Sequence, residues 1–298
     1  MSRLLPLPRL RLPPIPALML SMLSIQGGAA IAKSLFPVLG PAGVTVMRVG
    51  LSAIILLAIF RPNLLSLTLR QWRAAAIYGA TLGLMNLSFY YAILYIPLGL
   101  AVTLEFLGPL AVAVATSRRA ADLIWAGLAL LGIVLISPLG GNTPISPIGV
   151  ALAAVAGALW GGYIIIGARM ARHFSGTQGV SVGMICAAIT VMLCAAPLGF
   201  SPSQITPHLL LFGLGVAILS SALPYSLEMI ALRQLPRQLF SIMMSLEPAA
   251  AALLGWLILH ESLSLTQWLA IVCVIGASVG ATWQSRRTPD KHQEELLV

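Results

Sequence analysis

Charged side chains are scarce in this sequence. Of its 298 residues, 17 are Lys or Arg and 8 are Asp or Glu, so charged residues make up only 8% of the chain. Soluble domains carry roughly 25% charged residues, whereas here the hydrophobic fraction is 59% and the mean hydropathy is +0.97. A soluble globule of this composition would have too little polar surface to cover itself, and a disordered chain would need more charge. The composition therefore predicts an integral membrane protein.

Residues for catalysis and metal binding are also scarce. There is no G-x-x-x-x-G-K-[ST] loop and no H-E-x-x-H motif, which excludes P-loop ATP hydrolysis and the zinc-peptidase arrangement. An intramembrane aspartyl protease needs two membrane aspartates, but Asp122 and Asp290 are the only ones and lie outside the apolar runs. The three cysteines, Cys186, Cys194 and Cys273, lie in apolar runs without metal-ligand spacing. The sequence predicts neither an enzyme nor a metal site, and no cofactor.

The apolar residues form ten long segments. A spanning helix needs about 20 mostly apolar residues, and these runs lack the alternating polarity of a membrane β-barrel. The first run resembles a signal peptide, but it reaches about 20 residues and many others follow, so we expect an uncleaved helix. We place the spans at about 15–35, 42–60, 74–95, 98–116, 123–138, 148–168, 179–199, 209–230, 238–258 and 265–284.

The basic residues predict the orientation of these spans. The net charge is +9, but the basic side chains are spread over short connections, which is untypical of nucleic-acid binding. Fifteen of the 17 Lys and Arg residues lie in the two tails and after every second span, whereas 36–41, 96–97, 139–147, 200–208 and 259–264 contain none. Because cytoplasmic loops carry the excess of Lys and Arg, we expect an inner-membrane protein with both termini in the cytoplasm.

The two halves of the chain share an ordered set of residues. A constant offset of 139 pairs Ala92 with Ala231, Pro97 with Pro236, Pro109 with Pro248, and Asp122 with Glu261. The expected organisation is a tail (1–14), two five-helix repeats (15–138 and 148–284) and a second tail (285–298). Because five is odd, the second repeat is inverted in the membrane, which is typical of secondary transporters. The alternative is a gene duplication without mechanistic meaning.

Several longer motifs resemble a known family. They are SIQGGAAIAKSLFP (24–37), IPLGLAVTLEFLGPLAVA (96–113), SRR (117–119), VAILSSALPYSLEMIAL (216–232) and MSLEPA (244–249). These are similar to the threonine and homoserine exporters in the EamA-type branch of the drug/metabolite transporter superfamily, over roughly 15–284. The resemblance implies an inner-membrane exporter of small amino acids, with a central cavity lined by helices from both halves.

Five charged residues fall within the predicted spans: Lys33, Arg48, Glu105, Glu228 and Glu247. A charge at the centre of a membrane helix costs about 2.5–3.5 kcal/mol on insertion scales, so such groups face a bundle interior or a cavity. From the expected orientation, four of them lie between the membrane midplane and the outer surface. Glu228 is expected near the cytoplasmic end of its span, where it can reach water.

This mixture of charges fits a zwitterionic amino acid. A carboxylate needs a cation and an ammonium group needs a carboxylate, so we expect Glu105 or Glu247 to face the ammonium group and Arg48 or Lys33 to face the carboxylate. The alternatives are a structural Arg–Glu pair for Arg48 and an extension of Lys33 to the membrane surface. Polar and aromatic residues that could complete the pocket, or serve only in helix packing, are Gln26, Asn86, Tyr90, Trp160, Tyr163 and Tyr225.

Prolines accompany these acidic residues. Glu105 precedes Pro109 by four residues, and Glu247 directly precedes Pro248. We expect both prolines inside helices, where each would remove a backbone hydrogen bond and free a carbonyl group. Pro224 repeats the pattern beside Tyr225. A kink that serves only packing is the alternative.

The sequence thus predicts a secondary transporter that works by alternating access. Without a nucleotide site, exchange for protons is the default energy source, and Glu105 and Glu247 are the proton-coupling candidates. Export of a different small solute, a channel, and facilitated diffusion remain alternatives. The expected partners are an amino acid, protons and the lipid bilayer, but no nucleic acid, and the protein is expected to be a monomer or a homodimer.

Overall fold

The computed structural model describes residues 13–116, 122–136, 145–174, 178–224, 227, 231, 240 and 243–285. Every regular element in these segments is a helix, which confirms the predicted all-helical class for this part of the chain. The long helices are α1 (Pro14–Ser34), α2 (Phe36–Phe60), α3 (Leu69–Tyr95), α4 (Leu98–Thr116), α5 (Asp122–Ile136), α6 (Pro147–Ala171), α7 (Gln178–Ala195), α8 (Pro207–Ala217), α11 (Glu247–Leu259) and α12 (Leu265–Ser285). The π-helical segment η5 (Ile218–Ala222) continues α8, and the short 3₁₀ helices are η1 (Leu64–Ser66), η3 (Ala196–Leu198) and η4 (Pro202–Gln204).

Many of these helices are suited to a membrane. Among the described residues, α1, α2, α3, the first 21 residues of α6, and α7 with η3 are long and apolar enough to cross one. Shorter apolar helices occupy Leu98–Val112, Pro207–Ser220, Glu247–Leu259 and Leu265–Gly280. Proline or a capping side chain begins several of them: Thr68 and Gln71 form a capping box at the start of α3, and Pro147 begins α6.

Two predicted spans differ from the structure at a helix break. In α2, Gly40 has φ 64° and ψ 167°, and with Pro41 it separates a first turn from the long segment that the sequence predicts as 42–60. Glycine adopts this positive φ without steric cost. In the predicted span 238–258, a turn at Ser245–Leu246 precedes Glu247, so Pro248 lies in the first turn of α11 rather than inside a continuous helix. Proline is favoured there because its missing N–H would have no helical partner.

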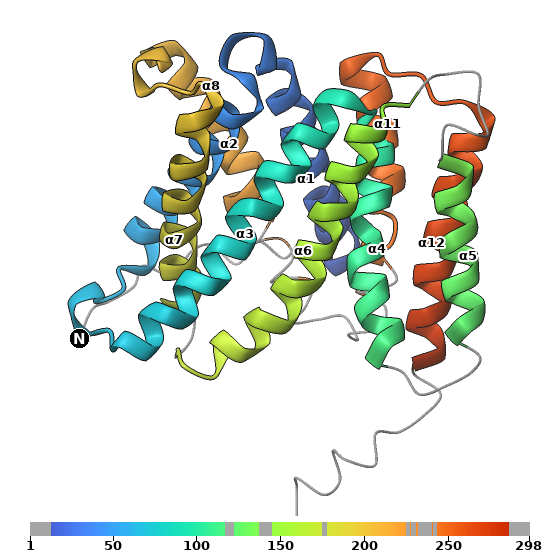
Figure 1. Cartoon of the computed structure of the whole chain (residues 1–298), viewed down its shortest axis with the longest axis horizontal. Helices are drawn as coiled ribbons and strands as arrows, with labels where there is room; N and C mark the ends of the chain where they lie inside the picture. The colour runs from blue at the N-terminus through green and yellow to red at the C-terminus, as the bar shows by residue number, and fades with distance from the viewer. Residues whose placement is uncertain are drawn as a thin grey trace, which may run out of the picture.

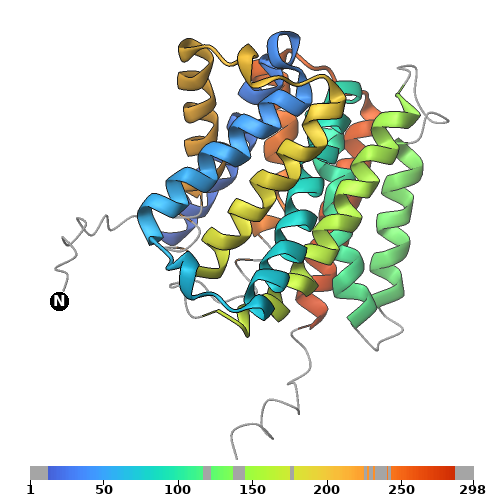
Figure 2. The same cartoon turned by 60° about the vertical axis from the view of Figure 1, so that its left-hand side comes forward.

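The helices of the two halves of the sequence interleave. Helix α3 packs against α6 and α7, α4 against α6 and α11, and α2 against α7 and α8. Helix α1 packs against α11 and η5, while α5 and α12 lie side by side at one edge of the bundle (Figure 1). The view turned by 60° shows the same bundle with its helices running roughly alongside one another (Figure 2). The two halves therefore share one interior instead of forming separate lobes.

Small residues bring helices α4 and α6 into backbone contact. A Cβ atom at Gly108 would overlap the carbonyl group of Gly157, and one at Gly157 would lie 2.8 Å from the carbonyl oxygen of Glu105. Small residues at such crossings are typical of membrane bundles, where close van der Waals packing drives helix association. This contact fixes the position of Glu105 against α6.

We predict that Gly108→Ala destabilises the protein whereas Gly50→Ala does not. The added methyl group at Gly108 must push α4 away from α6, and overpacking of this kind costs about 1–3 kcal/mol. Gly50 is the matched control, since a Cβ atom built there in α2 meets nothing within 4 Å. Thermal unfolding of the purified variants in detergent measures the difference. Equal unfolding midpoints for the two variants would contradict the close α4–α6 packing.

Candidate functional site

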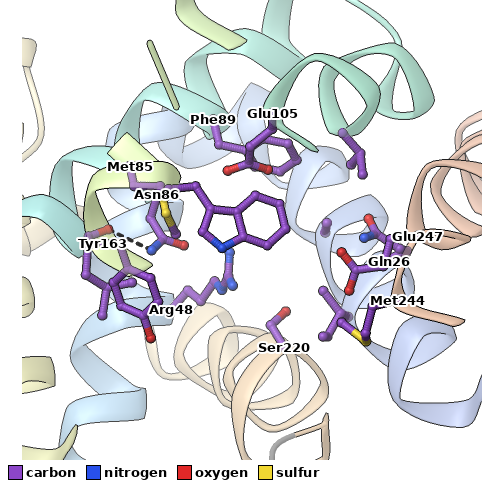
Figure 3. A pocket seen from close by; sticks show the side chains of 15 residues that line it. Gln26, Arg48, Met85, Asn86, Phe89, Glu105, Tyr163, Ser220, Met244 and Glu247 are labelled. Carbon is purple, nitrogen blue, oxygen red and sulfur yellow. Dashed lines mark hydrogen bonds between the residues drawn. The ribbon is translucent and has the colours of Figure 1, made fainter. Parts of the chain in front are cut away.

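A cavity of about 280 Å³ lies where α1, α2, α3, α4, α6, η5 and the start of α11 meet. Seven of its lining residues are sequence-predicted site residues: Gln26, Arg48, Asn86, Glu105, Trp160, Tyr163 and Glu247. Figure 3 shows Arg48 reaching into the cavity, with Glu105 on one wall and Gln26 and Glu247 on another. The volume is close to the lower end of the range of about 300–1,000 Å³ for small-molecule pockets, which suits a compact ligand.

Arg48 is held in place by Tyr90. Its Nη1 donates a hydrogen bond to the Tyr90 hydroxyl at 3.2 Å, and its Cζ lies 5.3 Å from the centroid of the Tyr90 ring, a cation–π contact. Tyr90 is fully buried and packs against Phe36 and Phe89. Tyr90 therefore supports Arg48 from behind and is not itself among the residues that line the cavity. A guanidinium has five N–H donors, so Arg48 has donors left for a ligand.

Two acidic residues reach the cavity from opposite halves of the sequence. Glu105 of α4 is 9% exposed, and among the described residues no hydrogen bond or ion pair within 4.0 Å joins its carboxylate to Arg48. Glu247 is 5% exposed and is the first residue of α11. A negative charge is stabilised there by the N-terminal end of the helix dipole. The break before α11 thus aims a carboxylate at the cavity from a helix terminus.

Uncharged polar groups complete the walls. Asn86 is tied back to its own helix, because its Nδ2 donates to the Leu82 carbonyl at 2.8 Å (Figure 3). The Tyr163 and Tyr78 hydroxyls are hydrogen-bonded at 2.8 Å. Gln26 and Ser220 differ from these, since Gln26 Oε1 and Ser220 Oγ are buried and have no hydrogen-bond partner. Trp160 stands edge-to-face against Phe106, with ring centroids 5.3 Å apart.

Lys33 lies apart from this cluster. Its Nζ forms an ion pair with Glu261 Oε1 at 2.5 Å and donates to the Ile96 carbonyl at 3.2 Å. The other carboxylate oxygen of Glu261 accepts from the backbone N–H of Leu98 at 2.8 Å, at the start of α4. His260, in the left-handed conformation at the end of α11, turns the chain so that Glu261 reaches this position. The sequence did not predict this pairing, because Glu261 lies 228 residues from Lys33.

The remaining sequence-predicted residues have mixed outcomes. Tyr225 and Glu228 lie outside the described residues. Pro109 lies inside α4, as expected, and Pro224 directly follows η5 and Leu223, with its carbonyl accepting from Ser21 Oγ at 3.3 Å. Sequence reasoning missed eight lining residues: Ile25, Ala29, Leu82, Met85, Phe89, Val102, Ser220 and Met244. Seven of them are apolar and carry no signal that separates a cavity wall from helix packing.

The arrangement can bind a small ligand that carries both charges. One anchored cation and two acids share a cavity whose other walls are aromatic, aliphatic or amide groups. Within the segments that the structure describes, no group of three or more His, Cys, Asp or Glu residues is placed to hold a metal ion.

Comparisons with known proteins show the family of this chain. Residues 147–283 match the model of the EamA-like transporter family. The chain is 46% identical to the threonine/homoserine exporter RhtA of Salmonella typhimurium (strain LT2), over 95% of this chain and 96% of that protein. It is also 46% identical to RhtA of Escherichia coli (strain K12), over 92% of each. One crystal structure is 20% identical in sequence to this chain and superposes with a TM-score of 0.58. The match covers 91% of this chain and 99% of the other, and it supports the fold alone. The chain therefore belongs to the EamA-like transporter family.

Proposed function

We propose that this protein exports small amino acids of the threonine and homoserine type across the bacterial inner membrane, as a secondary transporter. The observation that carries the proposal is the placement of Arg48, Glu105 and Glu247 around one cavity of about 280 Å³. The relatives named threonine/homoserine exporter RhtA, at 46% identity over nearly the whole chain, support the choice of substrate.

Arg48 binds the substrate carboxylate and Glu105 binds its ammonium group. The planar guanidinium can form two parallel hydrogen bonds to a carboxylate, and its contact with Tyr90 fixes its direction. Lys33 is committed to Glu261 and does not line the cavity, so the cationic role falls to Arg48. The ammonium group of the substrate likewise needs an opposite charge. Glu105 is available for it, because no ion pair within 4.0 Å joins its carboxylate to Arg48 in the described part of the chain.

The helix contacts support two inverted repeats in ten spans. In this scheme α1 to α5 (repeat 15–138) correspond in order to α6, α7, α8, α11 and α12 (repeat 148–284), with tails 1–14 and 285–298. If each helix is replaced by its counterpart in the other repeat, the α1–α11 contact becomes α4–α6, and α2–α8 becomes α3–α7. The α3–α6 contact becomes α1–α8. All six of these pairs are in contact. The α2–α7, α4–α11 and α5–α12 contacts map onto themselves. Such pseudo-symmetry is the usual basis of alternating access in secondary transporters.

Contacts between the proposed repeats join several helices at one end of the bundle. The Lys33–Glu261 ion pair joins the end of α1 and the start of α4 to the segment after α11. Connections 96–97 and 259–264 at this end contain no Lys or Arg, whereas the tails and the other set of connections hold 15 of the 17. By the positive-inside rule this end faces outward and both termini face the cytoplasm. Opening of the outer face would then require the ion pair to separate.

Proton exchange is the proposed energy source, and Glu105 and Glu247 are its two candidates. Both carboxylates are more than nine-tenths buried and line the cavity. A buried membrane carboxylate can alternate between a charged and a protonated form as its surroundings change, which is how proton relays in transporters work. Export of another small solute or conduction through a channel are the alternatives that the first experiment separates.

We predict that Arg48→Gln weakens the apparent affinity of saturable threonine and homoserine transport in sealed proteoliposomes. Loss of a charge-assisted contact costs about 1.5–3 kcal/mol, so the substrate concentration for half-maximal counterflow should rise about 10- to 100-fold. Arg48→Lys keeps the positive charge but cannot form the two parallel hydrogen bonds of a guanidinium, so its half-maximal concentration should lie between those of the wild-type protein and Arg48→Gln. Arg61→Gln is the matched control, because Arg61 is exposed at the end of α2.

Several outcomes would contradict this proposal. Unchanged affinity in Arg48→Gln would remove Arg48 from the binding site. Flux without saturation or counterflow would indicate a channel. If the wild-type protein carries neither threonine nor homoserine but carries another solute, the substrate assignment is wrong while the transporter assignment stands.

We predict that the double variant E105Q/E247Q loses the response of transport to a pH gradient. A glutamine keeps the shape of the side chain but cannot carry a proton. Counterflow under equal pH on both sides, measured in the same vesicles, separates loss of coupling from loss of binding. The single variants then show which acid is required. E247Q should lose only the gradient response if Glu247 carries the proton, whereas E105Q should also weaken counterflow because Glu105 binds the ammonium group. Full gradient-driven export in the double variant would exclude both acids as proton carriers.

We predict that Lys33 and Glu261 stabilise the protein as a coupled pair. A double-mutant cycle of Lys33→Met, Glu261→Gln and both together should give an interaction free energy of about 0.5–3 kcal/mol, as for residues in one ion-pair network. Unfolding in mixed detergent measures the free energies. Additive effects of the two substitutions would mean that the pair does not hold the outer face closed.

A further inference from the structure

Two polar side chains in the cavity lack a partner. Gln26 of α1 is 3% exposed and Ser220 of η5 is 4% exposed, and both line the cavity. Gln26 Oε1 and Ser220 Oγ make no hydrogen bond. Buried polar atoms in native proteins are nearly always paired, so an unpaired one needs an explanation. Among the described residues, no other buried side-chain nitrogen or oxygen lacks a hydrogen-bond partner.

Three other polar side chains in this bundle are satisfied by their own helix. Thr45, Thr103 and Asn86 each donate to the carbonyl group four residues earlier, at 2.7, 2.6 and 2.8 Å. Ser220 does not, because it lies in the π-helical segment Ile218–Ala222, whose backbone bonds run to the fifth residue. The Leu223 N–H, for example, donates to the Ile218 carbonyl. Single π turns inside α-helices occur frequently at functional sites.

Helix α1 holds this segment at the cavity wall. Ser24 Oγ donates to the Leu219 carbonyl at 2.7 Å. Gly28 lies so close to η5 that a Cβ atom there would meet Ser220 Oγ. Figure 3 shows the Ser220 side chain pointing into the cavity, with Gln26 across from it beside Glu247. The position of the Ser220 hydroxyl is therefore set by helix packing and not by a hydrogen bond of its own.

We infer that Gln26 and Ser220 form the subsite for a hydroxyl group on the substrate's side chain; this rests on the proposed function. The Gln26 Oε1 atom accepts only, so it needs a donor, whereas a serine hydroxyl both donates and accepts. A ligand hydroxyl can donate to Gln26 and accept from Ser220 at once. An alkyl group would leave both unpaired, and a site built to bind a hydroxyl discriminates against ligands that lack one.

The matched ligands for the test are threonine, homoserine and 2-aminobutyrate. Threonine and homoserine are the 3-hydroxy and 4-hydroxy derivatives of 2-aminobutyrate, so the three share their charged groups and carbon chain. The experiment measures initial counterflow rates of each ligand, at low concentration, in proteoliposomes of the full chain. The ratio of the threonine rate to the 2-aminobutyrate rate reports hydroxyl recognition, and the 2-aminobutyrate rate reports the amount of folded carrier.

The wild-type protein should favour threonine and homoserine over 2-aminobutyrate. Ser220→Ala and Gln26→Leu should each lower this ratio about 5- to 10-fold, as expected for one lost hydrogen bond. Ser220→Thr keeps the hydroxyl and should retain most of the ratio. Ser24→Ala is the matched control in the same α1–η5 contact, and it should leave the ratio unchanged even if total flux falls.

The results that overturn this inference differ from those that overturn the proposed function. If the wild-type protein carries threonine and 2-aminobutyrate equally well, or if Ser220→Ala and Gln26→Leu both keep the ratio, the hydroxyl subsite is wrong and amino-acid transport stands. An equal fall of the ratio in Ser24→Ala would show that helix packing alone sets it. If the wild-type protein carries none of the three ligands, the proposed function is wrong, and the subsite with it.

Discussion

An arginine held inside an apolar bundle is the constraint on which the rest of this structure depends. Arg48 cannot be neutralised by losing its proton, because a guanidinium stays charged under all ordinary conditions. The bundle therefore has to supply a π face and a hydroxyl acceptor, and the fully buried Tyr90 supplies both. The break at Gly40–Pro41 begins the long part of α2 seven residues before Arg48, which sets the depth of the charge. Two acids and several polar side chains line the same cavity as Arg48.

The two halves of the chain place an acidic side chain at the cavity in different ways. The first half offers Glu105 from inside α4, where backbone contact with α6 leaves no room for a larger side chain at the crossing. The second half offers Glu247 from the first turn of α11, where the helix dipole stabilises the negative charge. Lys33 at the end of α1 and Glu261 in the segment after α11 neutralise each other, and the cavity is lined by the other three charges. These charged residues are thus divided between an ion pair outside the cavity and three residues that line it.

The residues of this cavity that could be predicted from the sequence are the charged ones inside apolar segments. Arg48, Glu105 and Glu247 were found because charge inside an apolar run is costly and therefore informative. Lys33 was predicted to lie with them, but it pairs with Glu261 and does not line the cavity. Glu261 is distant in sequence, and no local pattern joins the two residues. Ser220 was missed because a serine among apolar residues is common, and the π turn that strips it of a partner is a property of the backbone. The turn before Glu247 was missed too, because Pro248 fits either a kink or a helix start.

The contact between α4 and α6 has a mechanical consequence. These two helices touch through the backbone at Gly108 and Gly157. Ridges of side chains resist sliding, because each must leave its groove before the next can be entered. A backbone contact without such ridges lets one helix shift along the other with few changes of rotamer. The glycines that bring Glu105 close to α6 therefore also allow α4 to move along α6 at this crossing.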